Sequence, residues 1–120
     1  MSRAVDLLLR AQELVAAGWA QGADARAADG RAVEPWAEDA ASWSVLGALV
    51  AALEEQGARG GELPLGELAV ALDALAAYVD EDSLSSWNDR PGHTARDVEA
   101  ALGRAAADAG RRQPPAISPN

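Results

Sequence analysis

The chain contains no cysteine, no lysine and no phenylalanine. Without cysteine it can form neither a disulfide framework nor a thiolate metal site, which fits a cytoplasmic protein. It also lacks any run of about 18 apolar residues, so the sequence predicts no membrane span. The first residues include Asp6 and no small-residue cleavage site, which argues against a signal peptide.

Positive charge is scarce along the chain. The ten strongly basic residues are all arginines and stand against 19 acidic residues, so the formal net charge is −9. Nucleic-acid binding requires clustered basic side chains that neutralise phosphates and release counterions. An anionic membrane surface repels an acidic chain for the same electrostatic reason. We therefore expect neither nucleic acid nor a membrane among the direct partners.

The length and composition predict one helical domain. A chain of 120 residues suffices for a single core, and we expect this domain to span residues 1–110. Alanine, the strongest helix former, supplies a quarter of the residues. The last ten residues, 111–120, contain three prolines and predict a disordered tail.

Apolar residues at three- and four-residue spacing predict four main helices, over 3–17, from about 36 or 38 to 56, over 65–79 and from Thr94 onward. A single helical turn is expected over 84–87. Thr94 and Asp97 have the spacing of a capping box at the start of the last helix. The predicted fold class is all-α, with four main helices in a compact, bundle-like domain.

Local signals add detail around the second helix. Asp29 and Gly30 form a tight-turn signal that predicts a short β-hairpin between helices one and two, with strands at 25–27 and 31–33. Gly47, inside the second helix, predicts a close approach of another element or backbone. The apolar stripe that we expect to be buried consists of Trp43, Leu46, Val50 and Leu53.

Tryptophan stands beside small and polar residues in three segments, at 18–22 (GWAQG), 43–49 (WSVLGAL) and 87–89 (WND). These segments resemble the bacterial DUF6197 family, whose members share a Gly-Trp-x-Gln-Gly-like segment, a Trp-Cys-x-x-Gly-Ala-Leu-like helix and a Trp-Asn-Asp turn. The resemblance covers roughly residues 5 to 107. It implies a relative of unknown function, with a family cysteine at the position of Ser44.

The three segments supply the candidate binding residues. In a functional interpretation these side chains line a small cleft, and they are Trp19, Gln21, Trp43, Trp87, Asn88 and Asp89. In a structural interpretation, Asn88 and Asp89 bond backbone groups or an arginine, while Trp87 fixes the turn to the core. We favour the structural interpretation. Trp36, which follows a proline at a loop-to-helix junction, is the tryptophan expected to be exposed.

Ser44, His93 and Asp89 supply the residue types of a nucleophilic triad and are weak catalytic candidates. Ser44, however, is predicted to lie inside the second helix, without the Gly-x-Ser-x-Gly elbow of an exposed nucleophile. We therefore expect that Ser44 is not a nucleophile. Serine in place of the family cysteine favours a packing role at this position, or else the loss of an activity in this member.

Carboxylates that could bind a hard cation are present near His93, at Asp80, Glu81, Asp82 and Asp89. No calcium loop, zinc pattern, phosphate loop or dinucleotide fingerprint accompanies them. Acidic runs at helix ends are usually solvated, so we expect neither a metal site nor a cofactor.

Two functions remain open. The favoured one is a small acidic accessory or interaction module that acts by protein binding or self-association. The alternative is a small metabolite-tailoring enzyme or small-molecule-binding protein, with a tryptophan-lined pocket and Asp89 as general base. A cleft that holds a carboxyl of raised pKa would favour the enzyme, and an exposed apolar patch would favour the interaction module.

Overall fold

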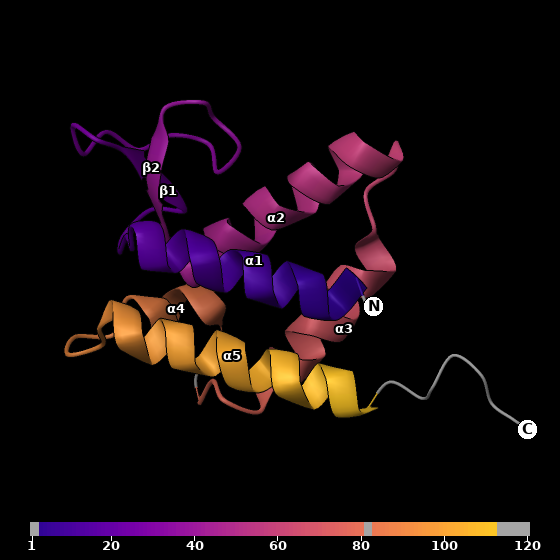
Figure 1. Cartoon of the computed structure of the whole chain (residues 1–120). Helices are drawn as coiled ribbons and strands as arrows, with labels where there is room; N and C mark the ends of the chain where they lie inside the picture. Colours follow the sequence, from indigo (N-terminus) through magenta and orange to yellow (C-terminus); the bar gives the residue numbers. More distant parts are fainter. Residues whose placement is uncertain (1–2, 81–82, 113–120) are drawn as a thin grey trace, which may run out of the picture.

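The computed structural model describes residues 3–80 and 83–112 and is mostly helical (Figure 1). In chain order its elements are α1 (Arg3–Ala17), β1 (Ala25–Ala27), β2 (Ala40–Trp43), α2 (Val45–Gly60), α3 (Leu65–Ala76), α4 (Leu84–Asn88) and α5 (Ala95–Arg112). The predicted helical character is confirmed. A strictly all-α fold of four helices is wrong, because the helical turn predicted at 84–87 is a fifth helix, α4, and β1 and β2 form a small antiparallel sheet. No described helix has the length and apolar character needed to cross a membrane.

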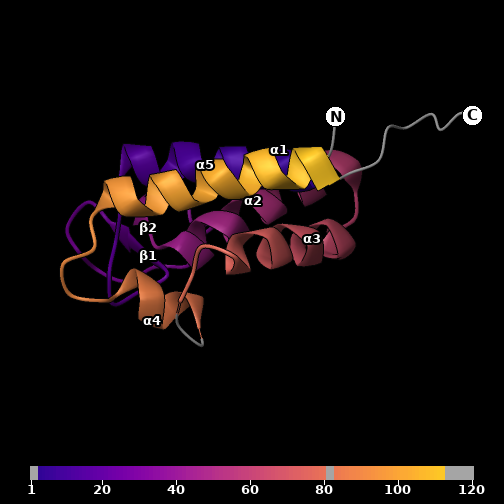
Figure 2. The same ribbon diagram turned by 90° about the horizontal axis from the view of Figure 1, so that it is seen from below.

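The helix α1 lies at the centre of the helical packing. It runs antiparallel to α5, and the two helices lie side by side in both views (Figures 1 and 2). The helices α2 and α3 also contact α1, and α3 packs against α5. The buried stripe of α1 repeats every three or four residues and consists of Ala4, Leu7, Leu8, Ala11, Leu14 and Val15.

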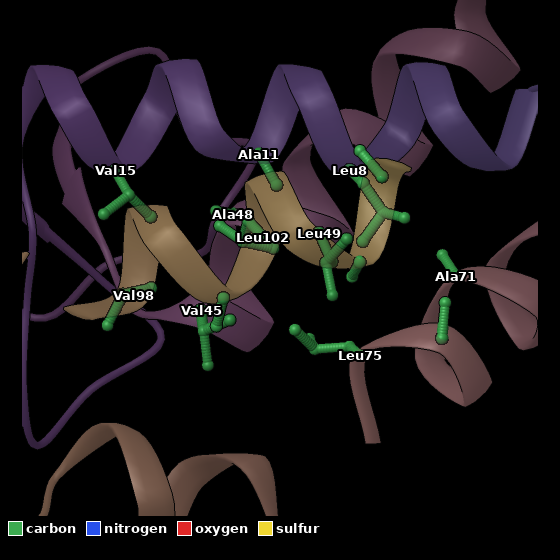
Figure 3. Close-up of a cluster of buried hydrophobic side chains, with 14 of the residues drawn as sticks. Leu8, Ala11, Val15, Val45, Ala48, Leu49, Ala71, Leu75, Val98 and Leu102 are labelled. Atoms are coloured by element: carbon green, nitrogen blue, oxygen red, sulfur yellow. The ribbon is translucent and has the colours of Figure 1, made fainter. Parts of the chain in front are cut away.

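One main apolar core fills the space between the helices (Figure 3). Leu8 of α1, Leu49 of α2 and Leu102 of α5 are fully buried in it, and Leu75 joins it from α3. Many of the remaining core residues are alanines, whose small side chains permit short distances between helix axes. The core therefore depends on close helix packing more than on large side chains.

The small sheet lies at the end of the bundle where α1 ends and α2 begins (Figure 1). The predicted tight turn is present, because Gly30 has a φ of 90° and its amide donates to the Ala27 carbonyl at 2.9 Å. The predicted pairing of 25–27 with 31–33 is present in part: the Ala27 amide donates to the Arg31 carbonyl at 2.8 Å, and the Val33 amide donates to the Ala25 carbonyl at 3.0 Å. Residues 31–33 form only a single antiparallel bridge and no strand of their own, and the strand that pairs with β1 is β2.

The predicted start of the second helix, at residue 36 or 38, is also wrong, because α2 begins at Val45. The backbone of Trp43 is bonded on both sides: its amide donates to the Gly18 carbonyl at 2.9 Å, and its carbonyl accepts from the Ala20 amide at 3.0 Å. A helix through Trp43 would lose both bonds. Apolar residues continue at helical spacing through Trp43, so this spacing does not mark where α2 begins.

The buried face of α2 differs from the predicted stripe. Leu53 is buried as predicted, but Trp43, Leu46 and Val50 are only half-buried. The helix contacts both α1 and α3, as expected for a helix with two apolar sides. The residues that it buries are Val45, Gly47, Ala48, Leu49, Ala51, Ala52 and Leu53.

The other helix boundaries lie close to the predictions. The helix α1 spans the predicted residues, and α3 ends at Ala76 instead of residue 79. The capping box before α5 is present, because the Asp97 carboxylate accepts from the Thr94 amide at 2.8 Å. The helix α5 continues to Arg112, into the predicted tail, and the rest of that tail (113–120) lies outside the described residues.

Gly47 confirms the predicted close approach, and the approaching group is backbone. A Cβ atom at this position would lie 1.9 Å from the carbonyl oxygen of Asp24. That carbonyl accepts a hydrogen bond from the Ser44 amide at 3.0 Å, so it cannot move away freely. The segment before β1 therefore packs directly on the first turn of α2.

Gly47→Ala should destabilise the protein by about 2–4 kcal/mol, because the added methyl group overlaps backbone that is itself hydrogen-bonded. The matched control is Gly66→Ala, at a helical glycine with open space around its Cβ direction. This change should leave stability unchanged or raise it by up to about 1 kcal/mol. Urea melts of both variants measure the difference, and equal stabilities would show that the contact at Gly47 is relaxed in solution.

Candidate functional site

The side chain of Asn88, the last residue of α4, is fully buried and uses both ends of its amide. Its Oδ1 accepts from Trp19 Nε1 at 2.8 Å and from the Val45 amide at 3.0 Å. Its Nδ2 donates to the Ala20 carbonyl at 2.9 Å and to Asp89 Oδ1 at 3.0 Å. One side chain thus joins the segment after α1, the start of α2 and the end of α4.

Neighbouring polar groups extend this network. Gln21 Nε2 donates to the Asn88 carbonyl at 3.0 Å, and the Gly22 amide donates to Asp89 Oδ1 at 3.0 Å. Gly22 has a φ of 80°, which glycine adopts without strain. These are bonds to backbone groups and buried polar atoms, as the structural interpretation of Asn88 and Asp89 requires.

The turn that carries Asn88 is held at both ends. Before it, the Ser83 hydroxyl accepts from the Ser86 amide at 3.1 Å and caps α4. Trp87 is buried and meets the ring of His93 edge to face, with ring centroids 4.7 Å apart. The large ring therefore fixes the short helix to the core, while the amide of Asn88 fixes its orientation.

An ion pair connects this turn to the segment that follows α3. Arg90 donates to the Asp80 carboxylate at 2.7 Å. That hydrogen bond and the positive charge of Arg90 lower the pKa of Asp80, although slight desolvation acts in the opposite direction. Asp80 is exposed, so the pair contributes modestly to stability.

Ser44 is the N-cap of α2, which corrects its predicted place inside a helix. Its hydroxyl accepts from the Gly47 amide at 3.0 Å, and the residue is only 3% exposed. An oxygen at this position satisfies one of the unpaired amides of the first helical turn. The hydroxyl therefore has a structural use that needs no catalysis.

The three weak catalytic candidates do not form one assembled triad. Ser44 and Asp89 border the same depression, of about 140 Å³, together with Gly22, Ala23, Asp24 and Ser85. His93 does not line this depression and instead packs on Trp87. Among the described residues, no hydrogen bond joins Ser44, Asp89 and His93 to one another.

Trp43 faces a different and larger depression, which we call the Trp36 depression. It has a volume of about 390 Å³ and is lined from α1, α2, β2 and the loop before β2 by Arg10, Leu14, Pro35, Trp36, Ala37, Glu38, Ala40, Trp43, Ala51, Glu54, Glu55 and Ala58. Trp36 is 54% exposed, as expected from the sequence. The carboxylates and Arg10 of this depression gave no sequence signal, because they lie on three separate elements.

A second exposed feature is the outer face of α3, which sequence analysis also missed. Its residues are Leu65, Gly66, Ala69, Val70, Asp73 and Ala76, together with the C-cap residue Ala77, and all of them are exposed. Leu65 is 60% and Val70 47% exposed. Apolar residues on both sides of this helix are the signal that could have revealed it.

In the segments 3–80 and 83–112, no three His, Asp or Glu side chains are close enough together to hold a metal ion. Asp80 instead pairs with Arg90, and Asp89 bonds the Gly22 amide. Two of the acidic residues considered as cation ligands, Glu81 and Asp82, lie outside the described residues.

Comparison with known proteins places the chain in a family. The profile of the family of unknown function DUF6197 matches residues 1–108. The chain belongs to the DUF6197 family. Neither the curated proteins nor the solved structures contain a match to it. Within this DUF6197 member, the matched residues cover the sheet, α1 to α4 and most of α5.

Asn88→Ala should cost this DUF6197 protein about 3–5 kcal/mol of unfolding free energy, because it leaves the Trp19 indole, the Val45 amide and the Ala20 carbonyl without a partner. Asp89→Asn should cost only about 1 kcal/mol, since an amide oxygen can still accept from Gly22. Thermal and urea melts of the two variants test the ranking. Near wild-type stability of Asn88→Ala would contradict the assigned role of this amide.

The pair of Asp80 and Arg90 predicts a pH effect. Because the folded pKa of Asp80 is lowered, its contribution is present above the unfolded pKa and is lost as pH falls through the folded pKa. Asp80→Asn should therefore melt below wild type at neutral pH, and the gap should close as pH falls below about 4. Glu62→Gln, at an exposed loop carboxylate, is the control. A gap that persists at acid pH would rule out the ion pair as its cause.

Proposed function

We propose that this DUF6197 member is a small acidic accessory protein that binds another protein through the outer face of α3. The observation that carries the proposal is the composition of that face: among its seven exposed residues, Asp73 alone is charged. Exposed apolar residues concentrated on one helix typically mark interaction sites. The absence of cysteine fits action in a reducing compartment such as the cytoplasm.

The solvent-facing sides of α1 and α5 carry more charged residues than the outer face of α3. Exposed positions of α1 include Arg3, Arg10 and Glu13, and those of α5 include Arg96 and Arg104. Such charged positions are usual for helices whose opposite side faces the core. Because α3 already buries Ala71, Ala74 and Leu75, its exposed apolar residues are not needed for the core of this chain.

Charge indicates what kind of partner fits this face. Glu62 and Glu67 lie beside it, and the whole chain carries a net charge of −9. Two copies of this chain would repel each other, whereas an apolar surface with a basic rim would be complementary. A 12-residue helix is about 18 Å long, so its face suits a transient partner better than an obligate one.

The enzyme alternative has less support from the geometry. Asp89 borders an opening of about 140 Å³, and ligand sites usually measure about 300 Å³ or more. The amide of Asn88 and the indole of Trp19 are bonded to each other and are not directed at that opening. The exposed apolar face of α3 therefore supports an interaction module more strongly than the small opening beside Asp89 supports a general-base enzyme.

Site-specific photo-crosslinking tests the proposal in cells that make the protein. A photoreactive residue at Val70 should give one discrete protein adduct, and the same residue at Arg104, exposed on α5, should not. The captured protein is then purified and its affinity measured by calorimetry. Val70→Asp should weaken binding by about tenfold or more while leaving the melting temperature unchanged, because the side chain is half exposed.

Three results would count against this proposal. Equal adducts from the two positions would show that the face is not selective. Unchanged affinity of Val70→Asp would place the contact elsewhere on the surface. An adduct between two copies of the chain, confirmed by sedimentation, would replace the heterologous partner with self-association.

A further inference from the structure

The Trp36 depression combines aromatic, apolar and acidic groups in one opening. Its volume of about 390 Å³ lies within the range of small-ligand sites. None of its lining residues belongs to the outer face of α3, so it is a separate feature from the proposed protein-binding surface. Its chemistry can therefore be considered independently of the proposed function.

The two tryptophans of the depression are positioned by the fold. Trp43 Nε1 donates to the Pro35 carbonyl at 3.0 Å, which ties the loop that carries Trp36 to the strand that carries Trp43. The Ala37 amide donates to the Glu34 carbonyl at 3.0 Å and closes a turn around Pro35 and Trp36. The backbone that carries Trp36 is thus fixed at the surface, where about half of the residue is exposed.

Two of the carboxylates that line the depression have no positively charged partner among the described residues. Arg10 lies between Glu55, at 2.8 Å, and Glu13, at 3.0 Å, and Glu55 is the larger cause that raises the pKa of Arg10 above its usual range. The positive charge of this arginine is therefore already balanced by carboxylates. Glu38 and Glu54 line the same opening, and their carboxylates form no hydrogen bond or ion pair with any described residue.

We propose that the Trp36 depression binds an organic cation, an ammonium or guanidinium group carried on a short apolar arm. Tryptophan is the aromatic side chain that attracts cations most strongly through its ring face. Glu38 and Glu54 supply the opposite charge, and Leu14, Pro35 and Ala51 supply apolar surface for the arm. An anion is disfavoured, because the only arginine of the opening is bonded to two glutamates.

The same chemistry has two sources, a free small amine and a basic side chain of a protein. Two probe pairs distinguish them: choline against its uncharged isostere 3,3-dimethylbutanol, and an acetyl-Gly-Arg-Gly-amide peptide against the same peptide with citrulline. The indole resonances of Trp36 and Trp43 in ¹⁵N-labelled protein report binding at the depression directly. Saturable shifts with choline indicate a small amine, and tighter binding of the arginine peptide indicates a protein side chain.

Variants of the intact chain locate the contacts. Trp36→Ala should abolish the shifts of the remaining Trp43 indole, and Glu38→Gln combined with Glu54→Gln should weaken binding about tenfold. Glu99→Gln, on α5, is the matched control and should bind as wild type. Trp36 and Glu38 are exposed, and Glu54 and Glu99 are partly exposed, so we expect these variants to fold, and a melt of each checks this.

Several results would overturn the cation site. These are equal shifts with the uncharged isosteres, unchanged affinity of the double carboxamide variant, and no saturable shift with either cationic probe. None of them bears on the outer face of α3, because the variants Val70→Asp and Trp36→Ala change different surfaces. The two proposals can therefore fail separately.

Discussion

The arrangement at one end of this protein depends on the hydrogen bonds of a single buried amide. Asn88 accepts from Trp19 and from the first amide of α2, and it donates to the Ala20 carbonyl. An aspartate could not donate, and an apolar residue would leave buried polar groups without partners, which is costly. The chain entering the sheet and the chain entering α2 are therefore positioned by one side chain that arrives from α4.

Because of this constraint, the polar groups around Trp19 and Asn88 are used within the fold. The polar groups of Trp19, Gln21 and Asn88 are occupied with one another and with backbone atoms. The two surfaces that we propose for binding lie elsewhere, on the outer face of α3 and around Trp36. In a chain of net charge −9, both surfaces suit partners that combine apolar and positively charged groups.

Much of the helical framework could be predicted from the sequence. The bounds of α1, the capping box of Thr94 and Asp97, and the close approach at Gly47 follow from spacing, side-chain chemistry and the cost of a helical glycine. The second strand and the start of α2 could not be predicted in this way. Apolar spacing around Trp43 is compatible with a helix, and only the distant carbonyl of Gly18 and amide of Ala20 make that segment extended.

The sequence by itself determined that the protein is acidic, alanine-rich and mainly helical, because composition and local periodicity act within a few turns of chain. Only the tertiary structure decided that the segment through Trp43 is extended so that α2 begins after Ser44, that Asn88 bonds three segments, and that Glu38 and Glu54 line one opening beside Trp36. Each of these outcomes depends on residues that are distant in sequence. The contacts between these residues form only when the helices pack, so a local sequence pattern does not predict them.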